Sequence, residues 1–264
     1  MKVKNKVFVV TGAGGGIGGA LVDALLARGA EIAAVDVKEE NLQKHQGDKR
    51  VSIHAVDITD KKAVAALPKS VIAAHGRVDG VVNNAGIIQP FVKVNDLKYE
   101  AIEKVMNVNF YGTLYVTKAF LPHLLDRSEA YVVNVSSMGG FLPVPGQSVY
   151  GASKAAVKLL TEGLYAELLN TDVRVSIVFP GATDTNISEN SGVKAPGGAA
   201  AEEAKKKFKA LPADKAAEII VRGIEKNKPQ IFTGKDSTFM NRLYRFKPVF
   251  ATKFIAKQMK SLLD

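Results

Sequence analysis

The sequence of 264 residues contains no cysteine, which excludes disulfide bonds, a thiolate nucleophile and cysteine-ligated metal sites. It also lacks any apolar run of about eighteen residues, the minimum for a membrane-spanning helix. Residues 1–10 lack the longer apolar stretch and the small-residue cleavage site of a signal peptide. We therefore expect a cytoplasmic protein without a metal site.

Positive charge is plentiful and unevenly distributed. The formal net charge is +10, and residues 235–264 contain seven Lys or Arg against two Asp, a net of +5. Apolar residues make up 47% of the chain and charged residues 23%, which is a globular composition without a dividing linker. These features predict one domain over residues 1–234, followed by a basic amphipathic helical tail over residues 235–264.

Short apolar segments alternate with helix-length segments through the first 180 residues. The expected strands are residues 6–10, 31–36, 51–57, 78–83, 131–136, 173–179 and 230–233. The expected helices are residues 17–28, 60–75, 99–125, 149–170 and 214–226. This alternation predicts an α/β fold, a doubly wound parallel sheet of the Rossmann type in three α/β/α layers. The Gly-, Ala- and Ser-rich segment within residues 186–210 is expected to be a mobile substrate loop.

A glycine-rich turn follows the first expected strand directly. The residues Thr11 to Gly18 read TGAGGGIG, with Gly12, Gly16 and Gly18 as the spaced glycines, and an expected helix opens from them. Bare backbone amides at a helix N-terminus suit the pyrophosphate of a dinucleotide. The alternative for this motif alone is a tight turn that binds no ligand.

Two acidic residues follow the next two expected strands. Asp36 ends the second strand, where its carboxylate can accept hydrogen bonds from both ribose hydroxyls and would repel a 2′-phosphate. This predicts NAD rather than NADP, although Lys38 lies close enough to weaken the preference. A solvated turn residue is the alternative for Asp36. Asp57 is expected to end the third strand beside the adenine.

Together, six motifs resemble those of the short-chain dehydrogenases/reductases over about residues 5 to 187. They are the glycine turn, residues 83–86 (NNAG), Asn109, Ser137, residues 150–154 (YGASK) and Pro180 with Gly181. Their order and spacing make a chance match improbable. The resemblance implies an oxidoreductase that acts on CH–OH groups, commonly as a homodimer or homotetramer.

The Tyr150 and Lys154 side chains lie four residues apart and therefore share one face of an expected helix. A tyrosine with a pKa of about 10 needs roughly 4 kcal/mol of stabilisation to act as an acid/base near neutrality. An ammonium about 4.5 Å away contributes roughly that amount at an effective dielectric of about 20. We therefore expect Tyr150 to exchange the proton, as a phenolate at working pH.

Two more residues complete the predicted catalytic set. Ser137 follows the fifth expected strand and can hold the substrate oxygen by its hydroxyl. The resemblance implies that Asn109, in a locally distorted helix, anchors a water in a proton relay to Lys154. Taken singly, Tyr150 could be a core residue and Ser137 a strand-end cap, but the joint spacing favours catalysis.

The predicted cofactor contacts lie after successive strands and include Tyr150 and Lys154, the latter through the nicotinamide ribose. Pro180, Gly181 and Thr185 are expected near the carboxamide. The remaining predicted contacts are Gly12, Gly14, Gly16, Ile17, Gly18, Asp36, Asp57, Ile58, Asn84, Ala85, Gly86 and Thr183. Residues 83–86 could also be no more than a strand-ending turn.

Apolar residues in the loops predict a hydrophobic secondary alcohol or ketone, such as a steroid, retinoid or acyl compound. These residues are Phe91, Phe141, Leu142, Val144 and Val149. The tail between residues 239 and 263 predicts two amphipathic helices interrupted at Pro248. We expect the tail to pack on the body or on a sister subunit, with peripheral attachment to an anionic membrane as the alternative.

The sequence thus predicts an NAD(H)-dependent oxidoreductase that interconverts a secondary alcohol and a ketone. The alternative from another class is an NAD-sensing or scaffold protein on the same fold, which would tolerate the loss of Ser137, Tyr150 or Lys154. Nucleic-acid binding is not expected, because the basic tail carries no aromatic stacking platform or recognition motif.

Overall fold

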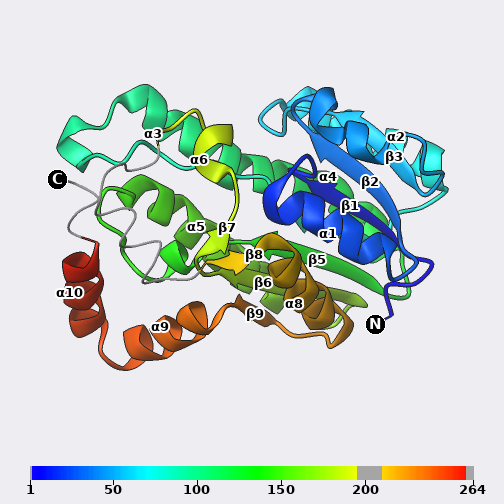
Figure 1. Ribbon diagram of the computed structural model, residues 1–264. Coiled ribbons are helices and arrows are strands. Elements are labelled where there is room, and N and C mark those ends of the chain that lie inside the picture. The colour runs from blue at the N-terminus through cyan, green and yellow to red at the C-terminus, as the bar shows by residue number, and fades with distance from the viewer. Residues whose placement is uncertain (1, 195–209, 260–264) are drawn as a thin grey trace.

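The structure is a computed structural model that describes residues 2–194 and 210–259. Its centre is a seven-stranded parallel sheet in the order β3-β2-β1-β4-β5-β6-β9 (Figure 1). The strands are β1 Val7–Thr11, β2 Glu31–Asp36, β3 Val51–Ala55, β4 Gly80–Asn83, β5 Ala130–Val135, β6 Val173–Pro180 and β9 Gln230–Thr233. The doubly wound α/β architecture expected from the sequence is confirmed.

Helices cover both faces of the sheet, because its strands are apolar on both sides. The helices are α1 Gly16–Leu26, α2 Lys61–His75, α3 Tyr99–Met106, α4 Thr113–Leu125, α5 Ser148–Glu167 and α8 Ala213–Glu225. On β1, Phe8 and Val10 pack with α1 and α8, whereas Val7 and Val9 pack with α2, α4 and α5. Three 3₁₀ segments, η1 Glu39–His45, η2 Val94–Asp96 and η4 Met138–Gly140, lie in the connections.

The sequence predicted one helix over residues 99–125, and this prediction needs correction. The segment η3, Asn107–Gly112, is a π-helix between α3 and α4. A π-helical turn holds an extra residue and displaces side chains relative to an α-helix, which hydrophobic periodicity does not reveal. The local distortion expected around Asn109 is therefore present.

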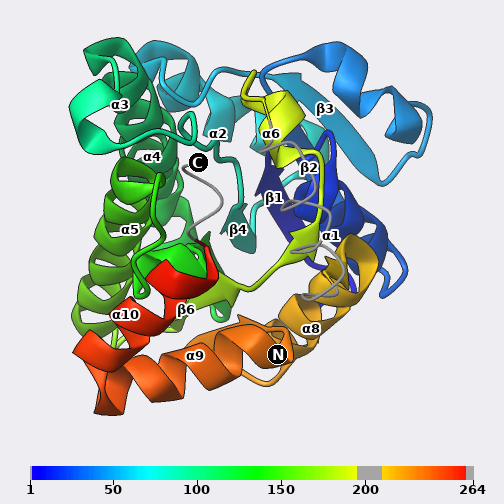
Figure 2. The same ribbon diagram turned by 60° about the vertical axis from the view of Figure 1, so that its left-hand side comes forward.

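The remaining elements follow β6. Two-residue strands β7 Thr183–Asp184 and β8 Leu211–Pro212 pair with each other, and α6 spans Ile187–Asn190. Residues 195–209 of the expected substrate loop lie outside the described residues. The tail forms α9 Lys235–Phe246 and α10 Pro248–Gln258, broken at Pro248 as expected and seen in orange and red in Figure 2.

The strand order reverses at β1, which lies between β2 and β4. In open parallel sheets, ligands bind at the carboxyl ends of the strands beside such a reversal. This edge carries the glycine turn after β1 and the residues that follow β4 and β5.

Candidate active site

The glycine turn after β1 has a backbone that glycine adopts readily. Gly12 has a φ of 65° and Gly16 a φ of 55°, both in the left-handed region. A Cβ on Gly12 would lie 2.9 Å from the Cα of Ala85, so the turn presses against the segment after β4. Around Gly15 there is open space, and α1 begins at the next residue with no acidic side chain in its first turn.

Asn84 and Thr11 hold this turn against β4. The Asn84 side-chain amide donates to the Thr11 and Gly12 carbonyl oxygens, at 3.1 and 3.3 Å. The Thr11 hydroxyl oxygen accepts from the backbone N–H groups of Asn84 and Ala85, each at 3.1 Å. Asn84, predicted as a cofactor contact, thus also shapes the cradle that would hold the cofactor.

Asp36 stands at the end of β2, directly beside the turn. Its Oδ2 accepts from the backbone N–H of Gly14 at 3.0 Å, and its Oδ1 accepts from the Asn41 side-chain amide at 3.1 Å. A Cβ on Gly14 would lie 2.8 Å from Asp36 Oδ2, which explains a glycine there. The carboxylate is therefore held at the mouth of the cradle, where a ribose would lie.

The opposite wall of the cradle comes from the segment after β6. A Cβ on Gly16 would lie 3.4 Å from Thr185, which places these two predicted contacts side by side. The Gly181 backbone N–H donates to the Thr233 carbonyl oxygen at 3.0 Å, and the Thr183 hydroxyl donates to the Gly181 carbonyl oxygen at 3.1 Å. The space at Gly15, the helix N-terminus and the flanking carboxylate together fit a dinucleotide.

The three predicted catalytic side chains Ser137, Tyr150 and Lys154 meet beside this cradle. Tyr150 and Lys154 both lie on α5, and Ser137 follows β5. A Cβ on Gly139 would lie 3.5 Å from both Ser137 Oγ and Tyr150 Cε1, and Ser137 forms a side-chain hydrogen bond with Tyr150. The serine and tyrosine hydroxyls therefore share one position for a substrate oxygen.

Lys154 is 4% exposed and lies four residues after Tyr150 on α5. Its Nζ donates to the Val135 carbonyl oxygen at 3.1 Å. A Cβ on Gly86 would lie 2.9 Å from this Nζ and 3.2 Å from Asn109 Oδ1. A glycine at position 86 thus allows the lysine and Asn109 to approach the segment after β4.

The pKa values of the pair correct one expectation. From the sequence we expect Lys154 to lower the pKa of Tyr150 enough to give a phenolate. In the structure burial raises the pKa of Tyr150, and the hydrogen bond with Ser137 opposes this rise only in part. Burial also lowers the pKa of Lys154 to about 8. Desolvation, which a Coulomb interaction between two neighbouring groups does not include, disfavours both charged forms.

Asn109 is buried in η3, and its side chain makes three hydrogen bonds. Its Oδ1 accepts from the Ile87 N–H at 2.9 Å, and its Nδ2 donates to the Ile87 carbonyl and the Ser153 hydroxyl, each at 2.9 Å. The amide thus ties the segment after β4 to α5. The proton-relay role implied by resemblance stays a prediction.

Gln89 is a functional candidate that the sequence analysis missed. This buried side chain accepts, through Oε1, from the N–H groups of Val149 and Tyr150 at 2.8 and 2.9 Å. Its Nε2 donates to the Gly146 carbonyl oxygen at 3.0 Å. The sequence offers one signal for this residue, a single amide side chain within the otherwise apolar segment 87–91.

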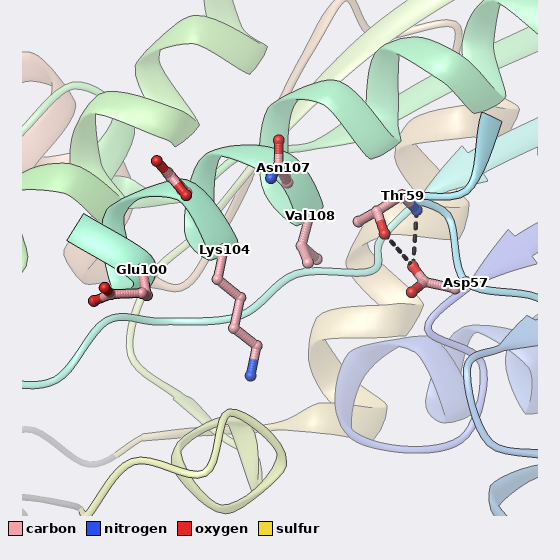
Figure 3. A pocket seen from close by; sticks show the side chains of 7 residues that line it. Asp57, Thr59, Glu100, Lys104, Asn107 and Val108 are labelled. Carbon is pink, nitrogen blue, oxygen red and sulfur yellow. Dashed lines mark hydrogen bonds between the residues drawn. The ribbon is translucent and has the colours of Figure 1, made fainter. Parts of the chain in front are cut away.

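The expected end of the third strand at Asp57 needs correction, whereas the cofactor contacts of Asp57 and Ile58 stay predictions. β3 ends at Ala55, so Asp57 lies in the following turn, where its Oδ1 accepts from the Thr59 N–H and hydroxyl, each at 2.8 Å (Figure 3). The Ile58 side chain is buried in the core beside Gly112.

A cavity of about 350 Å³ lies beside Asp57. Its lining consists of Asp57, Thr59, Glu100, Glu103, Lys104, Asn107 and Val108, several of which are drawn in Figure 3. It contains none of the four predicted catalytic residues, so this cavity is separate from the candidate catalytic site.

A parallel sheet that reverses its strand order beside a glycine-rich turn defines the class of dinucleotide-binding α/β proteins. Comparison with known families narrows this class, because residues 6–195 match the family described as short chain dehydrogenase. The chain belongs to the short-chain dehydrogenase/reductase family of oxidoreductases.

Relatives and solved structures support this membership. An uncharacterized oxidoreductase of Staphylococcus epidermidis is 38% identical over 192 residues, which cover 72% of this chain and 83% of that protein. SadH of Mycobacterium tuberculosis is 35% identical over 92% of this chain and 91% of its own. The resemblance drawn from the six motifs is therefore confirmed.

Two crystal structures from the same family match nearly the whole chain. A Burkholderia phymatum protein in complex with NAD has a TM-score of 0.82 and 26% identity, covering 95% of this chain and 96% of its own. A Burkholderia cenocepacia protein in complex with NADP has a TM-score of 0.81 and 28% identity, covering 98% and 99%. The similar structures thus include complexes with either nucleotide.

Proposed function

We propose that this oxidoreductase interconverts a hydrophobic secondary alcohol and the corresponding ketone, with NAD(H) as the hydride carrier. The observation that carries the proposal is the meeting of Ser137, Tyr150 and Lys154 beside a cradle that fits a dinucleotide. Bound there, the nicotinamide would supply or accept the hydride.

Tyr150 holds the proton that the reduced substrate needs. Because burial raises its pKa, the hydroxyl is neutral at working pH and can donate a proton to a ketone oxygen. The Ser137 hydroxyl, already bonded to Tyr150, donates a second hydrogen bond to the same oxygen as it gains negative charge. The alcohol-oxidising direction uses the same groups in reverse.

Lys154 stabilises the tyrosinate that remains after proton donation. With a pKa of about 8, its side chain is mostly protonated at neutral pH, although it is almost fully buried. A cation one helical turn from Tyr150 favours loss of the phenol proton during the reaction, when the negative charge appears. The pair therefore contributes most in the transition state, where it accelerates the reaction.

The preference for NAD over NADP rests on Asp36. A 2′-phosphate would approach a carboxylate that is fixed by Gly14 and Asn41, and like charges would repel. Lys38 does not offset this charge through an ion pair with Asp36 within the described residues, since only its backbone N–H bonds to the carboxylate.

The hydrophobic substrate class rests on fewer side chains than the sequence predicted. Leu142 is fully buried in a core cluster with α9 and α10, and Phe141 packs edge-on against Phe179. Phe91, Val144 and Val149 remain partly exposed; Val144 and Val149 precede Tyr150 closely in the chain, and Phe91 follows Gln89, which contacts the Tyr150 N–H. These three side chains still favour an apolar substrate.

A panel of ketones with NADH and NADPH tests the proposal. We expect turnover of hydrophobic ketones, faster with NADH. Turnover of small hydrophilic ketones alone would contradict the substrate class, and NADH binding without any turnover would favour the sensor or scaffold alternative. The expected homodimer or homotetramer and the cytoplasmic location stay predictions.

A further inference from the structure

The α9–α10 pair has one side that packs on the body of the protein. Met240, Ala251 and Ile255 are buried against Leu142, with Phe141 and Met138 at the edge of the cluster. These three body residues lie in the segment between Ser137 and α5, so the pair packs on the segment that joins β5 to α5. The packing on the body expected for the tail therefore accounts for one side of the pair.

The other side exposes large apolar side chains. Phe246 is 85% exposed, and Phe239 and Phe250 are 59% and 56% exposed. We name this side the aromatic–basic face; its apolar residues are Phe239, Phe246, Val249, Phe250 and Phe254. Phe250 and Phe254 stack with ring centroids 6.4 Å apart. Single exposed apolar residues are ordinary, but a cluster of this kind marks a contact surface.

Cationic side chains lie among these aromatic residues. Arg242 and Lys247 line the same groove as Phe239, Phe246 and Phe250. The described cations of the pair are Lys235, Arg242, Arg245, Lys247, Lys253 and Lys257. None of the ion pairs among residues 2–194 and 210–259 involves these six side chains.

The charge of the face argues against a second copy of this chain as its partner. Asp236 is the one acidic residue of the described helix pair, and its Oδ2 already accepts from the Ala182 N–H at 2.8 Å. Two such faces in a symmetric contact would place cations against cations without acidic partners. A surface that is both apolar and anionic satisfies the aromatic and the cationic groups together.

We propose that the aromatic–basic face docks the protein on an anionic lipid membrane. The phenylalanines would enter the boundary between head groups and acyl chains, while the lysine and arginine side chains contact the lipid phosphates. No helix among the described residues could span a membrane, so the contact is peripheral. This inference does not depend on the proposed reaction.

Vesicle flotation tests the proposal with the full chain. We expect binding to vesicles of phosphatidylcholine mixed with phosphatidylglycerol, weak binding to phosphatidylcholine alone, and loss of binding as salt rises. The triple variant R242Q/K247Q/K253Q should bind about a hundredfold more weakly, because each basic residue near the membrane surface contributes about a fivefold factor to the binding constant. The variant F246S/F250S should lose binding even at low salt.

Matched variants elsewhere on the surface provide the control. K49Q/K62Q/K69Q removes three exposed lysines from other elements, and Y99S/L169S removes two exposed apolar side chains; both should bind like the wild type. Equal binding of all variants would overturn the proposal. So would an absence of vesicle binding together with a change of oligomeric state in F246S/F250S, which would assign the face to a second copy.

A second inference concerns Gln89 and rests on the proposed function. The N-cap residue of α5, Gln147, makes no side-chain cap hydrogen bond. Gln89 caps this helix from another segment of the chain, through the N–H groups of Val149 and Tyr150. The Gln147 side chain donates in turn to the Gln89 carbonyl oxygen at 2.8 Å.

We infer that Gln89 is a positioning residue that fixes Tyr150. Helix N-termini need acceptors for their first N–H groups, and here a buried amide supplies one at the catalytic tyrosine itself. The same segment is fixed to Asn109 at Ile87 and to the Ser191 hydroxyl at Ile88. A small displacement of Tyr150 would separate it from the substrate oxygen.

Kinetics and hydrogen exchange test this role. In Q89M we expect kcat to fall about a hundredfold with unchanged NADH affinity, because misplacement of a reacting group costs that much. Q89E keeps the acceptor and should retain more activity; Q89N serves if Q89M does not fold. The Val149 and Tyr150 amides should exchange faster in Q89M.

Unchanged exchange and unchanged kcat in both Q89M and Q89N would overturn the inference, as would equal loss in Q89E and Q89M. If the Val149 and Tyr150 amides exchange faster in Q89M but the wild type turns over no ketone, the capping role of Gln89 stands and the proposed reaction is contradicted.

Discussion

The interior around α5 and the surface of α9 and α10 depart from ordinary residue placement in opposite ways. Around α5, polar side chains are buried and bonded to one another, as Asn134 is to Asn83 and Thr161. On α9 and α10, aromatic side chains are exposed among cations. Buried polar groups and exposed apolar patches are the informative exceptions in a folded protein. The first exception surrounds the candidate active site, and the second is the face that we propose as a docking surface.

The two regions should also respond differently to mutation. Each buried polar group near α5 has partners that lose their hydrogen bonds when it is removed, so substitutions there should affect turnover or stability. The exposed groups of the aromatic–basic face have few partners within the chain, so substitutions there should leave both unchanged.

The largest effect is expected for Tyr150→Phe. Removal of the hydroxyl eliminates the proton donor, and turnover should fall by about a thousandfold, within the range for loss of general acid catalysis. NADH affinity, measured by fluorescence titration, should be nearly unchanged. Turnover close to that of the wild type would contradict the role of Tyr150 as the proton donor.

The next effect concerns the burial of Lys154. Its pKa is about 8 in the folded protein, against an ordinary value of 10.5. Between these values the unfolded chain binds a proton that the folded chain does not, so this group makes stability rise as pH increases from about 8 to about 10.5, by about 3 kcal/mol. The free energy of unfolding, measured by urea denaturation, should rise between about pH 8 and about pH 10.5 in the wild type relative to Lys154→Met. A parallel pH profile for the two proteins would contradict the burial.

The buried polar side chains should affect stability to a smaller extent. Asn134→Ala removes hydrogen bonds to Asn83 and Thr161, at 2.8 and 2.9 Å. We expect a loss of about 2 kcal/mol in the free energy of unfolding. Asn95→Ala, at an exposed position, is the control and should change stability by less than about 0.5 kcal/mol. Equal losses of stability at the two positions would contradict a stabilising role of the buried hydrogen bonds of Asn134.

The smallest effect is expected for Asp36→Ser. Without the carboxylate, the repulsion of a 2′-phosphate disappears, and the ratio of NADPH to NADH affinity should rise about tenfold, or about 1.4 kcal/mol. Isothermal titration with both nucleotides measures this ratio. An unchanged ratio would show that another group selects the cofactor.

The sheet could be predicted from the sequence because its strands are short, apolar runs between amphipathic segments. The strands at residues 31–36 and 230–233 have the predicted bounds, and the others differ by one or two residues. The π-helix at Asn107–Gly112 could not be predicted in this way, because hydrophobic periodicity continues through it.

The candidate site was predictable where it depends on local spacing, as for Tyr150 and Lys154. It was not predictable where it depends on contacts between distant segments. Gln89 reaches α5 across about sixty residues of chain, and Leu142 turns into the core beneath α10. The pKa of Tyr150 depends on burial, which a Coulomb estimate between two neighbours does not include.

The separation of the two regions can be measured on one set of preparations. Ketone turnover with NADH and flotation on phosphatidylglycerol-containing vesicles are recorded for the wild type, Tyr150→Phe and F246S/F250S. We expect Tyr150→Phe to float like the wild type without turning over ketone, and F246S/F250S to turn over a water-soluble ketone without floating. A variant that loses both turnover and flotation while remaining folded would contradict the separation of catalysis from membrane docking. A Tyr150→Phe protein that keeps its turnover would contradict the catalytic role of Tyr150.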